Sequence, residues 1–236
     1  ETGIISQLDR KIDASLGRLQ RNFVELYQLH NRIQSVGDKD NFSAKDILKR
    51  GGVADAMEKF KSDERIKSIG ITALGDIDAI NEVVLSDCFD VAQIYYNLLN
   101  PSASYNSSRN WNDHNFSNLI NNCISKDMGL MNIRIYAAGY LATDKRHGRE
   151  IPVTFGINEN ELNRRVEKIN LIFNDVNGTK AQKALRYGLS NKDMSTIVIG
   201  LANIEHLKEA LKGYDQGHLD EETLMRIEEL QNKNFN

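Results

Sequence analysis

The amino-acid sequence predicts an α/β protein built around a parallel β-sheet. Short apolar runs alternate along the chain with longer segments whose apolar residues recur at helical spacing. Strands that alternate with helices in this way form βαβ units, whose parallel sheet is buried on both faces. With 236 residues, 40% of them hydrophobic, the chain is long enough to build one sizeable core.

The predicted elements follow one another in a regular order. Apolar runs, predicted as strands, lie at 23–29, 67–72, 89–96, 132–138 and 195–200. Segments of helical period, predicted as helices, lie at 6–19, 51–64, 76–86, 115–128, 161–190 and 203–213. Polar segments, predicted as loops, lie at 31–50, 97–114 and 142–160. The last segment, 214–236, is predicted as an acidic, partly helical tail.

Capping residues support two of the helices. Asp76 and Asn203 each precede a helical segment. They are predicted N-caps, because side chains of this kind accept hydrogen bonds from the free N–H groups of a first turn. Gly213 is predicted to end the helix that Asn203 begins.

Composition excludes several classes of function. A formal net charge of −3 with 27% charged residues gives no clustered basic face for nucleic acid. No apolar stretch approaches the roughly 18 residues that span a bilayer, so no membrane association is expected. Cys88 and Cys123 form no C-x-x-C pair and have no histidine at metal-ligand spacing. We therefore expect two reduced thiols in a cytoplasmic protein without a metal site.

The residues at the ends of the predicted strands indicate a ligand site. In a parallel sheet the carboxyl ends of the strands share one edge, where ligands bind. Four of the five ends are polar or aromatic and the fifth is a glycine before a helix: His30, Thr72, Gln93, Tyr136 and Gly200. Each also has a structural explanation, since histidines satisfy strand ends, tyrosines pack in cores and glycines form turns. Their coincidence on one edge favours a ligand site.

Five segments, taken in order, resemble the second part of the aldo-keto reductase barrel. They are LYQLH (26–30), KSIGIT (67–72), AQIYYNLLNP (92–101), NIRIYAAGYL (132–141) and STIVIGLANIE (195–205). The resemblance implies a partial (β/α)8 TIM barrel of about five parallel strand–helix units, equivalent to the family's strands four to eight. It also implies that 1–236 is a single domain lacking the family's N-terminal part, and the first residues, Glu1-Thr2-Gly3, include no methionine.

The resemblance also implies an NAD(P)-dependent oxidoreductase that interconverts a carbonyl and an alcohol by hydride transfer. The family's mechanism uses an aspartate, a tyrosine, a lysine and a histidine, of which only the histidine has a counterpart, His30. His30 would orient the carbonyl, whereas the tyrosine that protonates the alkoxide would precede residue 1. The absence of the other three residues argues against turnover by this chain alone.

The same resemblance assigns residues to the cofactor. Gln93 would hydrogen-bond the nicotinamide carboxamide beside Thr72, which stands where the family often has serine. Tyr136 would stack on the nicotinamide ring. The turn from Gly200 to Asn203 would hold the pyrophosphate or the adenosine ribose, using N–H groups at a helix start.

Charge favours NAD over NADP as this cofactor. A 2′-phosphate calls for lysine or arginine in the first turns after the glycine. The chain has His206 there, with Glu205 and Glu209 beside it, and acidic side chains repel a phosphate. His206 and Glu209 would line the adenosine end of the site, and Lys208 is the cation that could reach round to a phosphate.

Substrate and partners are less closely defined by the resemblance. The polar, Asn- and Ser-rich segment 102–118 fits a sugar or hydroxy-aldehyde, and a second copy of the chain would cover the two open edges of the sheet. One alternative is a non-catalytic cofactor-binding or scaffold protein with a degenerate barrel. Another is a different barrel enzyme that uses His30 in lyase or hydrolase chemistry. The charged segment 144–150 is either a lid over an anionic substrate or a solvated loop.

Overall fold

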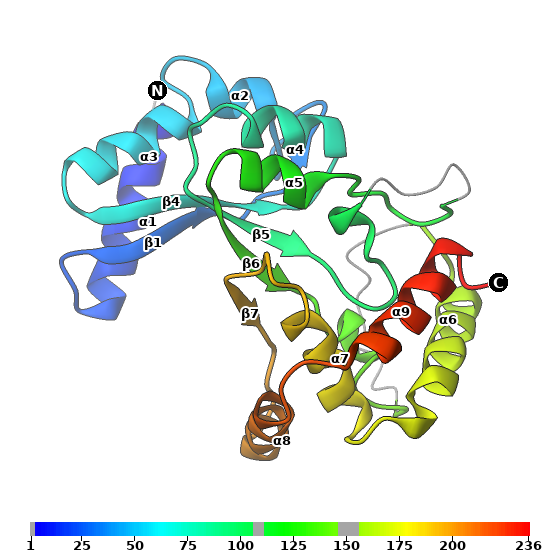
Figure 1. Cartoon of the computed structure of the whole chain (residues 1–236). Helices are drawn as coiled ribbons and strands as arrows, with labels where there is room; N and C mark the ends of the chain where they lie inside the picture. Colours follow the sequence, from blue (N-terminus) through cyan, green and yellow to red (C-terminus); the bar gives the residue numbers. More distant parts are fainter. Residues whose placement is uncertain (1–2, 106–110, 146–155) are drawn as a thin grey trace. The chain divides into compact units, whose positions relative to one another are not determined.

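A computed structural model describes residues 3–105, 111–145 and 156–236 of the chain (Figure 1). It divides into two units: unit 1 comprises Glu1–Ile94 and Asn121–Leu130, and unit 2 comprises Tyr95–Ile120 and Met131–Asn236. In both units the strands pair in parallel and alternate with helices. The predicted α/β class is therefore confirmed.

Unit 1 is built on three parallel strands that pair in the order β1, β4 and β5. They coincide with three predicted apolar runs, as β1 (Val24–Leu29), β4 (Ile66–Ala73) and β5 (Val91–Tyr95). The middle strand β4 is buried from Ile69 to Ala73, as its apolar character predicts.

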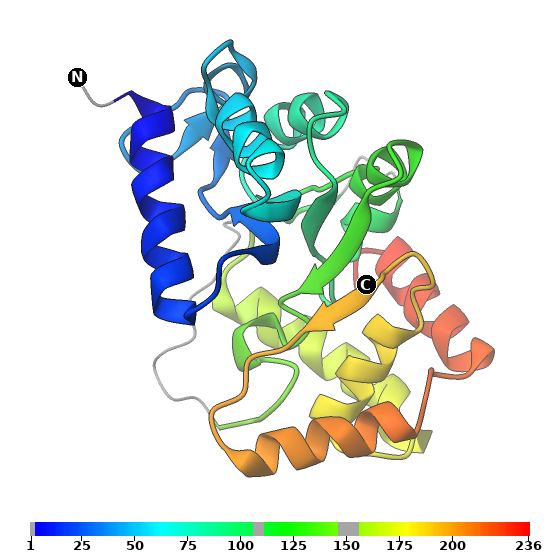
Figure 2. The same cartoon turned by 90° about the vertical axis from the view of Figure 1, so that its left-hand side faces the viewer.

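The helices of unit 1 also match predicted segments, as α1 (Ile4–Leu19), α3 (Val53–Ser62) and α4 (Ile77–Val84). Helix α1 packs on α3, and α3 packs on β4 (Figure 2). The buried residues of α1, Ile12 and Leu16, are one helical turn apart. Asp76 is the N-cap of α4, as predicted, but its carboxylate accepts hydrogen bonds from Ser35 and none from the helix.

The prediction of a loop over 31–50 is wrong in part. This segment contains the short parallel pair β2 (Ile33–Gln34) and β3 (Phe42–Ser43), followed by α2 (Ala44–Leu48). A capping box between Ser43 and Asp46 begins α2. Elements of two to five residues are too short to show a hydrophobic period, which explains why the sequence did not predict them.

Unit 2 contains one parallel strand pair and the four helices α6 to α9 among its described residues. Met131–Ile133 of strand β6 (Gly129–Ile133) pair with β7 (Thr196–Val198). The helices are α6 (Glu159–Ile172), α7 (Lys180–Leu189), α8 (Ile204–Asp215) and α9 (Glu221–Asn232). Helix α7 packs on α8, and α6 packs on α9. Helix α5 (Leu119–Ser125) forms within the predicted 115–128. Its first two residues belong to unit 2 and the rest belong to unit 1.

The strand predicted at 132–138 ends earlier than expected, at Ile133. Arg134, Ala137 and Ala138 have φ angles of 63°, 45° and 55°, in the left-handed region that side chains other than glycine rarely adopt. A strand cannot continue through such angles. Tyr136 therefore lies in a turn after β6, immediately before a 3-10 turn at Ala137–Gly139.

The single helix predicted at 161–190 is wrong, because the segment forms α6 and α7 with a break between them. A 3-10 turn at Phe173–Asp175 follows α6, and Gly178 has a φ of 110°. Thr179 then begins α7 through a capping box with Gln182. The T-x-x-Q pattern of that box is visible in the sequence and could have predicted the break.

The C-terminal residues pack more fully than the sequence suggested. Gly213 does not end α8, which continues to Asp215; it is buried, and a Cβ there would lie 3.1 Å from Gln182 Cγ. The predicted tail is helical at α9, where Ile227 is fully buried, and Phe235 beyond it is also fully buried. Its helical character is as predicted, but it forms part of the core of unit 2.

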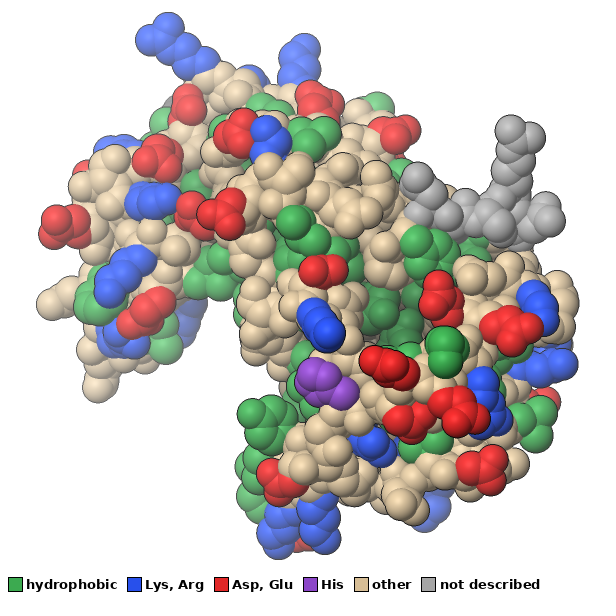
Figure 3. Space-filling view, in the orientation of Figure 1, with side chains coloured by type: hydrophobic (Ala, Val, Ile, Leu, Met, Phe, Trp, Pro, Cys, Tyr) green, Lys and Arg blue, Asp and Glu red, His purple; other side chains and the backbone are tan. Residues whose placement is uncertain are grey.

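Helix α8 presents apolar side chains to solvent (Figure 3). Ile204, Leu211 and Tyr214 are 60%, 53% and 64% exposed, and Val198 of β7 is 41% exposed. Across the described ranges, no helix is long and apolar enough to cross a membrane.

Candidate active site

Polar side chains share one face of the sheet in unit 1. The strand register pairs Gln28 with Gly70 and Thr72 with Gln93. Register partners on neighbouring parallel strands point their side chains to the same face, and residues two apart on a strand do so as well. His30 follows the last residue of β1 and lies beyond the same end of the sheet. Three residues predicted at strand ends therefore meet here.

These side chains form one continuous hydrogen-bonded chain. His30 Nδ1 lies 2.9 Å from Thr72 Oγ1. The Thr72 hydroxyl donates to Gln93 Oε1 at 3.0 Å, and Gln93 Nε2 donates to Gln28 Oε1 at 3.1 Å. His30 is exposed whereas Thr72 is buried, so the chain runs from an accessible imidazole into the sheet.

Gln28 is a member of this chain that the sequence prediction missed. It lies two residues before His30 on the same strand, and that spacing was a usable signal because alternation puts both on one face. Gly70 leaves room for it, since a Cβ at position 70 would lie 3.0 Å from Gln28 Cγ and 3.0 Å from the Val91 carbonyl oxygen.

The Gln93 amide has hydrogen-bonding capacity left for a ligand. A primary amide offers two N–H groups and two oxygen lone pairs, and the internal bonds use one of each. One donor and one acceptor remain, and a carboxamide also presents one group of each kind. The remaining N–H donor and oxygen acceptor of Gln93 therefore fit the carboxamide of the nicotinamide cofactor that the resemblance implies.

Two other predicted site residues approach each other in unit 2. Burial, and then the negative charge of Glu209, raise the pKa of Tyr136 to about 12. Glu209 itself accepts a hydrogen bond from Thr179 Oγ1 at 2.6 Å. The sequence prediction gave Glu209 no structural partner, whereas in the structure it binds Thr179, the N-cap residue of α7.

The start of α8 is an exposed turn. Asn203 is its N-cap, as predicted, and accepts a hydrogen bond from the backbone N–H of His206 at 3.0 Å. His206 Nδ1 in turn accepts from the N–H of Ala202 at 3.3 Å. Gly200 is exposed, and a Cβ there would meet no atom within 4 Å. Some of the N–H groups expected to bind phosphate therefore already have internal acceptors.

Charge around α8 is more balanced than the sequence suggested. Lys208 forms an ion pair with Glu205 at 2.8 Å, and both side chains are exposed. Glu205 is therefore partly neutralised, and Lys208 has a carboxylate partner. The charged segment 144–150, predicted as a lid or a solvated loop, is described only in part, because residues 146–150 lie outside the described residues. Its first residue, Asp144, forms an ion pair with Lys180 at 2.7 Å.

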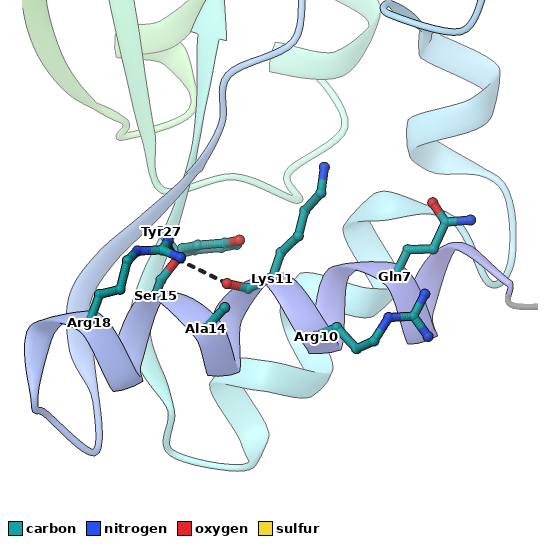
Figure 4. A pocket seen from close by; sticks show the side chains of 7 residues that line it. All are labelled: Gln7, Arg10, Lys11, Ala14, Ser15, Arg18 and Tyr27. Carbon is teal, nitrogen blue, oxygen red and sulfur yellow. Dashed lines mark hydrogen bonds between the residues drawn. The ribbon is translucent and has the colours of Figure 1, made fainter.

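A surface depression lies on helix α1 and strand β1. It has a volume of about 500 Å³ and is lined by Gln7, Arg10, Lys11, Ala14, Ser15, Arg18 and Tyr27 (Figure 4). Tyr27 precedes Gln28 on β1, so it points to the opposite face of the sheet from the hydrogen-bonded chain. None of the predicted site residues lines this depression.

Both cysteines are free, as predicted. Cys123 is buried, and burial raises the pKa of its thiol to about 12; Cys88 is half-buried. In the part of the chain that the structure describes, no three histidine, cysteine, aspartate or glutamate side chains gather as a metal site would require.

Comparison with known proteins assigns the family. A sequence profile described as "Aldo/keto reductase family" matches residues 2–232. The chain belongs to the aldo/keto reductase family. The match spans nearly the whole chain and gives no support to the expectation of a missing N-terminal part.

Individual aldo/keto reductase relatives are more distant. The chain is 24% identical over 237 residues to L-galactose dehydrogenase from Arabidopsis thaliana, covering 93% of this chain and 62% of that protein. It resembles the structure of an aldo-keto reductase from Bacillus halodurans in its holo form, with a TM-score of 0.70 and 18% identity. That likeness covers 96% of this chain and 65% of the other.

The apo form of the Bacillus halodurans enzyme gives a TM-score of 0.68, with 18% identity and coverage of 96% and 68%. At this identity the likeness concerns the fold alone. It is compatible with the predicted partial barrel of parallel strand–helix units. The chain spans less than two thirds of the length of the L-galactose dehydrogenase and of the holo structure.

Proposed function

We propose that this chain is an NAD(P)-dependent oxidoreductase component that interconverts a carbonyl and an alcohol by hydride transfer. The observation that carries the proposal is the hydrogen-bonded chain from His30 through Thr72 to Gln93, in a member of the aldo/keto reductase family. These three residues lie together at one face of a parallel sheet, and they are residues that the family resemblance assigns to substrate and cofactor binding.

In this proposal each residue has a separate task. His30 orients the substrate oxygen, Gln93 and Thr72 hold the carboxamide of the cofactor, and Tyr136 stacks on its ring. The nicotinamide, when bound, supplies or accepts the hydride. Gly200, Asn203, His206 and Glu209 of the α8 region are proposed to hold the pyrophosphate and adenosine. Since His30 is the member of the family's catalytic set with a counterpart in this sequence, we propose that cofactor binding survives in this chain whereas turnover is weak.

We propose NAD as the cofactor and a sugar or hydroxy-aldehyde as the substrate. The ion pair between Lys208 and Glu205 supports NAD, because a lysine with a carboxylate partner is less available to a 2′-phosphate. The relative from Arabidopsis thaliana, named for a sugar, supports the substrate class, as does the polar segment 102–118. A cytoplasmic location stays a prediction from composition.

We also propose that a second copy of the chain covers open apolar surface in unit 2. β7 has a partner on one side in the described structure, and Val198 and several α8 side chains are exposed. Light scattering after size-exclusion chromatography tests this. A dimer that becomes a monomer in Leu211→Glu supports the proposal, and a monomeric wild type contradicts it.

Titration of the chain with NADH and with NADPH, followed by nicotinamide fluorescence, tests the cofactor proposal. The matched variants are Gln93→Leu, which removes the proposed carboxamide partner, and Gln7→Leu, which changes an exposed glutamine of α1. We expect saturable binding, tighter for NADH, that Gln93→Leu weakens and Gln7→Leu leaves unchanged.

The outcomes separate the alternatives. Tighter binding of NADPH contradicts the choice of NAD. An equal loss of NADH affinity in Gln7→Leu and in Gln93→Leu contradicts the proposed cofactor site. Absence of binding to a cooperatively folded chain favours the non-catalytic scaffold. Oxidation of L-galactose with NAD, followed by nicotinamide absorbance, then tests the substrate class.

A further inference from the structure

The side chain of Asn97 is fully buried in unit 2, and its three hydrogen bonds are all to backbone groups. Asn97 Oδ1 accepts from the N–H of Leu99 at 3.0 Å and from the N–H of Asn100 at 3.1 Å. Asn97 Nδ2 donates to the carbonyl oxygen of Arg134 at 3.1 Å. A backbone N–H can only donate and a carbonyl oxygen can only accept, so the orientation of this amide is determined. Asn97 therefore ties segment 97–100 to the turn after β6.

The turn that Asn97 holds carries Tyr136 and has an unusual backbone. Arg134, Ala137 and Ala138 all have left-handed φ angles, although none of them is glycine. Such angles persist only where the surrounding structure enforces them, and they are concentrated at functional sites. The Arg134 carbonyl oxygen accepts from the N–H of Ala137 at 2.9 Å as well as from Asn97. One bond closes the turn, and the other holds it against segment 97–100.

Helix α9 holds one peptide group of this segment. Gln231 Nε2 donates to the carbonyl oxygen of Leu98 at 2.9 Å, in the buried interior of unit 2. This oxygen and the N–H of Leu99 belong to the same peptide group, and that N–H donates to Asn97. Gln231 and Asn97 therefore bind opposite sides of one peptide group, so that a rotation of this group would break at least one of the two bonds.

Helix α6 holds the next peptide group in the same way. Arg165 Nη1 donates to the carbonyl oxygen of Leu99 at 2.9 Å, and the N–H of the same group, from Asn100, donates to Asn97. Hydrogen bonds joined through amide groups polarise one another, so the two bonds that Asn97 Oδ1 accepts strengthen the one that its Nδ2 donates. Two helices are thus connected through Asn97 to the carbonyl oxygen of Arg134.

We propose that Asn97 is a positioning residue, through which α6 and α9 hold the turn that presents Tyr136 to the nicotinamide ring. None of the residues proposed to contact the cofactor lies in segment 97–100, in α6 or in α9, so these elements act on the ring through the turn. The hold on the turn follows from the contacts within unit 2. Its effect on the cofactor rests on the proposed oxidoreductase function, in which Tyr136 stacks on the ring.

Substitutions that remove a single donor test this role in the full chain. Asn97→Asp keeps the shape and the acceptor of the side chain but puts an oxygen opposite the Arg134 oxygen, which it repels. The matched control is Asn100→Asp, at a second buried asparagine, whose Nδ2 donates at 2.7 Å to the carbonyl oxygen of His114 and not to the turn. Gln231→Met is a milder variant that leaves Asn97 in place and removes the donor from α9.

Nuclear Overhauser effects in the cofactor-free chain, labelled with nitrogen-15 at alanine, report the turn directly. The amide and α protons of one residue are closer at a positive φ than at the angles of a strand or a helix, so the effect between them is stronger. We expect strong intraresidue effects for Ala137 and Ala138 in the wild type and in Asn100→Asp. They should be weakened in Asn97→Asp, and less so in Gln231→Met.

Titration with NADH tests the connection to the ring. Asn97→Asp should weaken NADH binding by no more than the roughly two- to tenfold expected when the aromatic face of Tyr136 is lost, since it acts only through that side chain. In a chain that already carries Tyr136→Leu, Asn97→Asp should cause no further loss, because two residues that act through one contact are not additive. Asn100→Asp should leave NADH affinity unchanged.

The proposal is overturned if the strong effects at both alanines persist in Asn97→Asp, or if Asn100→Asp weakens them equally. It is also overturned if Asn97→Asp and Tyr136→Leu reduce NADH affinity additively. Should Asn97→Asp fail to fold, Gln231→Met is judged by the same criteria. Failure of the oxidoreductase proposal is distinct, because the wild type then binds no NADH while the turn still depends on Asn97.

Discussion

The guanidinium carbon of Arg165 lies 4.6 Å from the centre of the Phe235 ring, inside unit 2. The ring of Trp111 lies 4.9 Å from the same carbon, and the Arg165 side chain is fully buried. The guanidinium also donates to Glu161 at 3.1 Å and to the carbonyl oxygen of Leu99 at 2.9 Å. One buried cation thus joins α6, two loop segments and the residues after α9.

Replacing this cation should be costly. Arg165→Met keeps an apolar stem but leaves the buried Asp113 carboxylate, 3.5 Å from the guanidinium, without its cation and the Leu99 carbonyl without its donor. We therefore expect a loss of about 3–5 kcal/mol in the free energy of unfolding. Urea unfolding followed by circular dichroism measures it. Lys212→Met, at an exposed lysine of α8, should change stability by less than about 0.5 kcal/mol. Similar effects of both variants would contradict the role of Arg165.

Two glycines of unit 1 should respond in opposite ways to alanine. Gly75 has a φ of 134°, and a Cβ there would overlap the carbonyl oxygen of Ile33. Gly75→Ala should therefore destabilise by roughly 3 kcal/mol. Gly17, inside α1, has nothing within 4 Å of such a Cβ, and Gly17→Ala should stabilise by about 0.5–1 kcal/mol. Thermal unfolding compares the two, and a stable Gly75→Ala would contradict the structure.

The capping box of α2 predicts a dependence of stability on acid. The Ser43 hydroxyl, and then Lys49, lower the pKa of Asp46 from 3.8 to about 2. A carboxylate whose pKa is lower in the folded than in the unfolded state stabilises above the unfolded pKa, and loses that effect as pH falls through the folded value. Asp46→Asn should thus be destabilised by about 1 kcal/mol at pH 7. The difference from wild type should disappear between about pH 4 and pH 2, and a difference independent of pH would contradict this account.

Tyr136 offers a test of the proposed ring stacking. Tyr136→Phe keeps an aromatic face and should bind NADH as the wild type does. Tyr136→Leu removes that face and should weaken binding roughly two- to tenfold, since aromatic pairs contribute about 0.5–1.5 kcal/mol beyond their buried area. Fluorescence titration distinguishes the variants. Equal affinities for Phe and Leu would show that Tyr136 does not stack on the cofactor.

The sequence by itself determined the fold class, the family and most of the regular elements. Strands β1, β4 and β5 and helices α1, α3 and α4 were predictable because burial imposes a local pattern of apolar residues. The resemblance to aldo-keto reductases was also readable, and the family match confirms it. His30 and Thr72 could be named because each lies at or beside the end of such an apolar run, whereas Gln93, also predicted at a strand end, is the middle residue of β5.

Only the tertiary structure decided how those residues are connected. The register of β1 on β4 and β5 puts Gln28 within reach of Gln93, and no local pattern encodes the pairing of residues 65 positions apart. The turn that contains Tyr136 depends on left-handed backbone angles at Arg134, Ala137 and Ala138, which side-chain chemistry does not reveal. Apolar periodicity reports which side of an element is buried, whereas hydrogen bonds between distant strands depend on how those elements pack together.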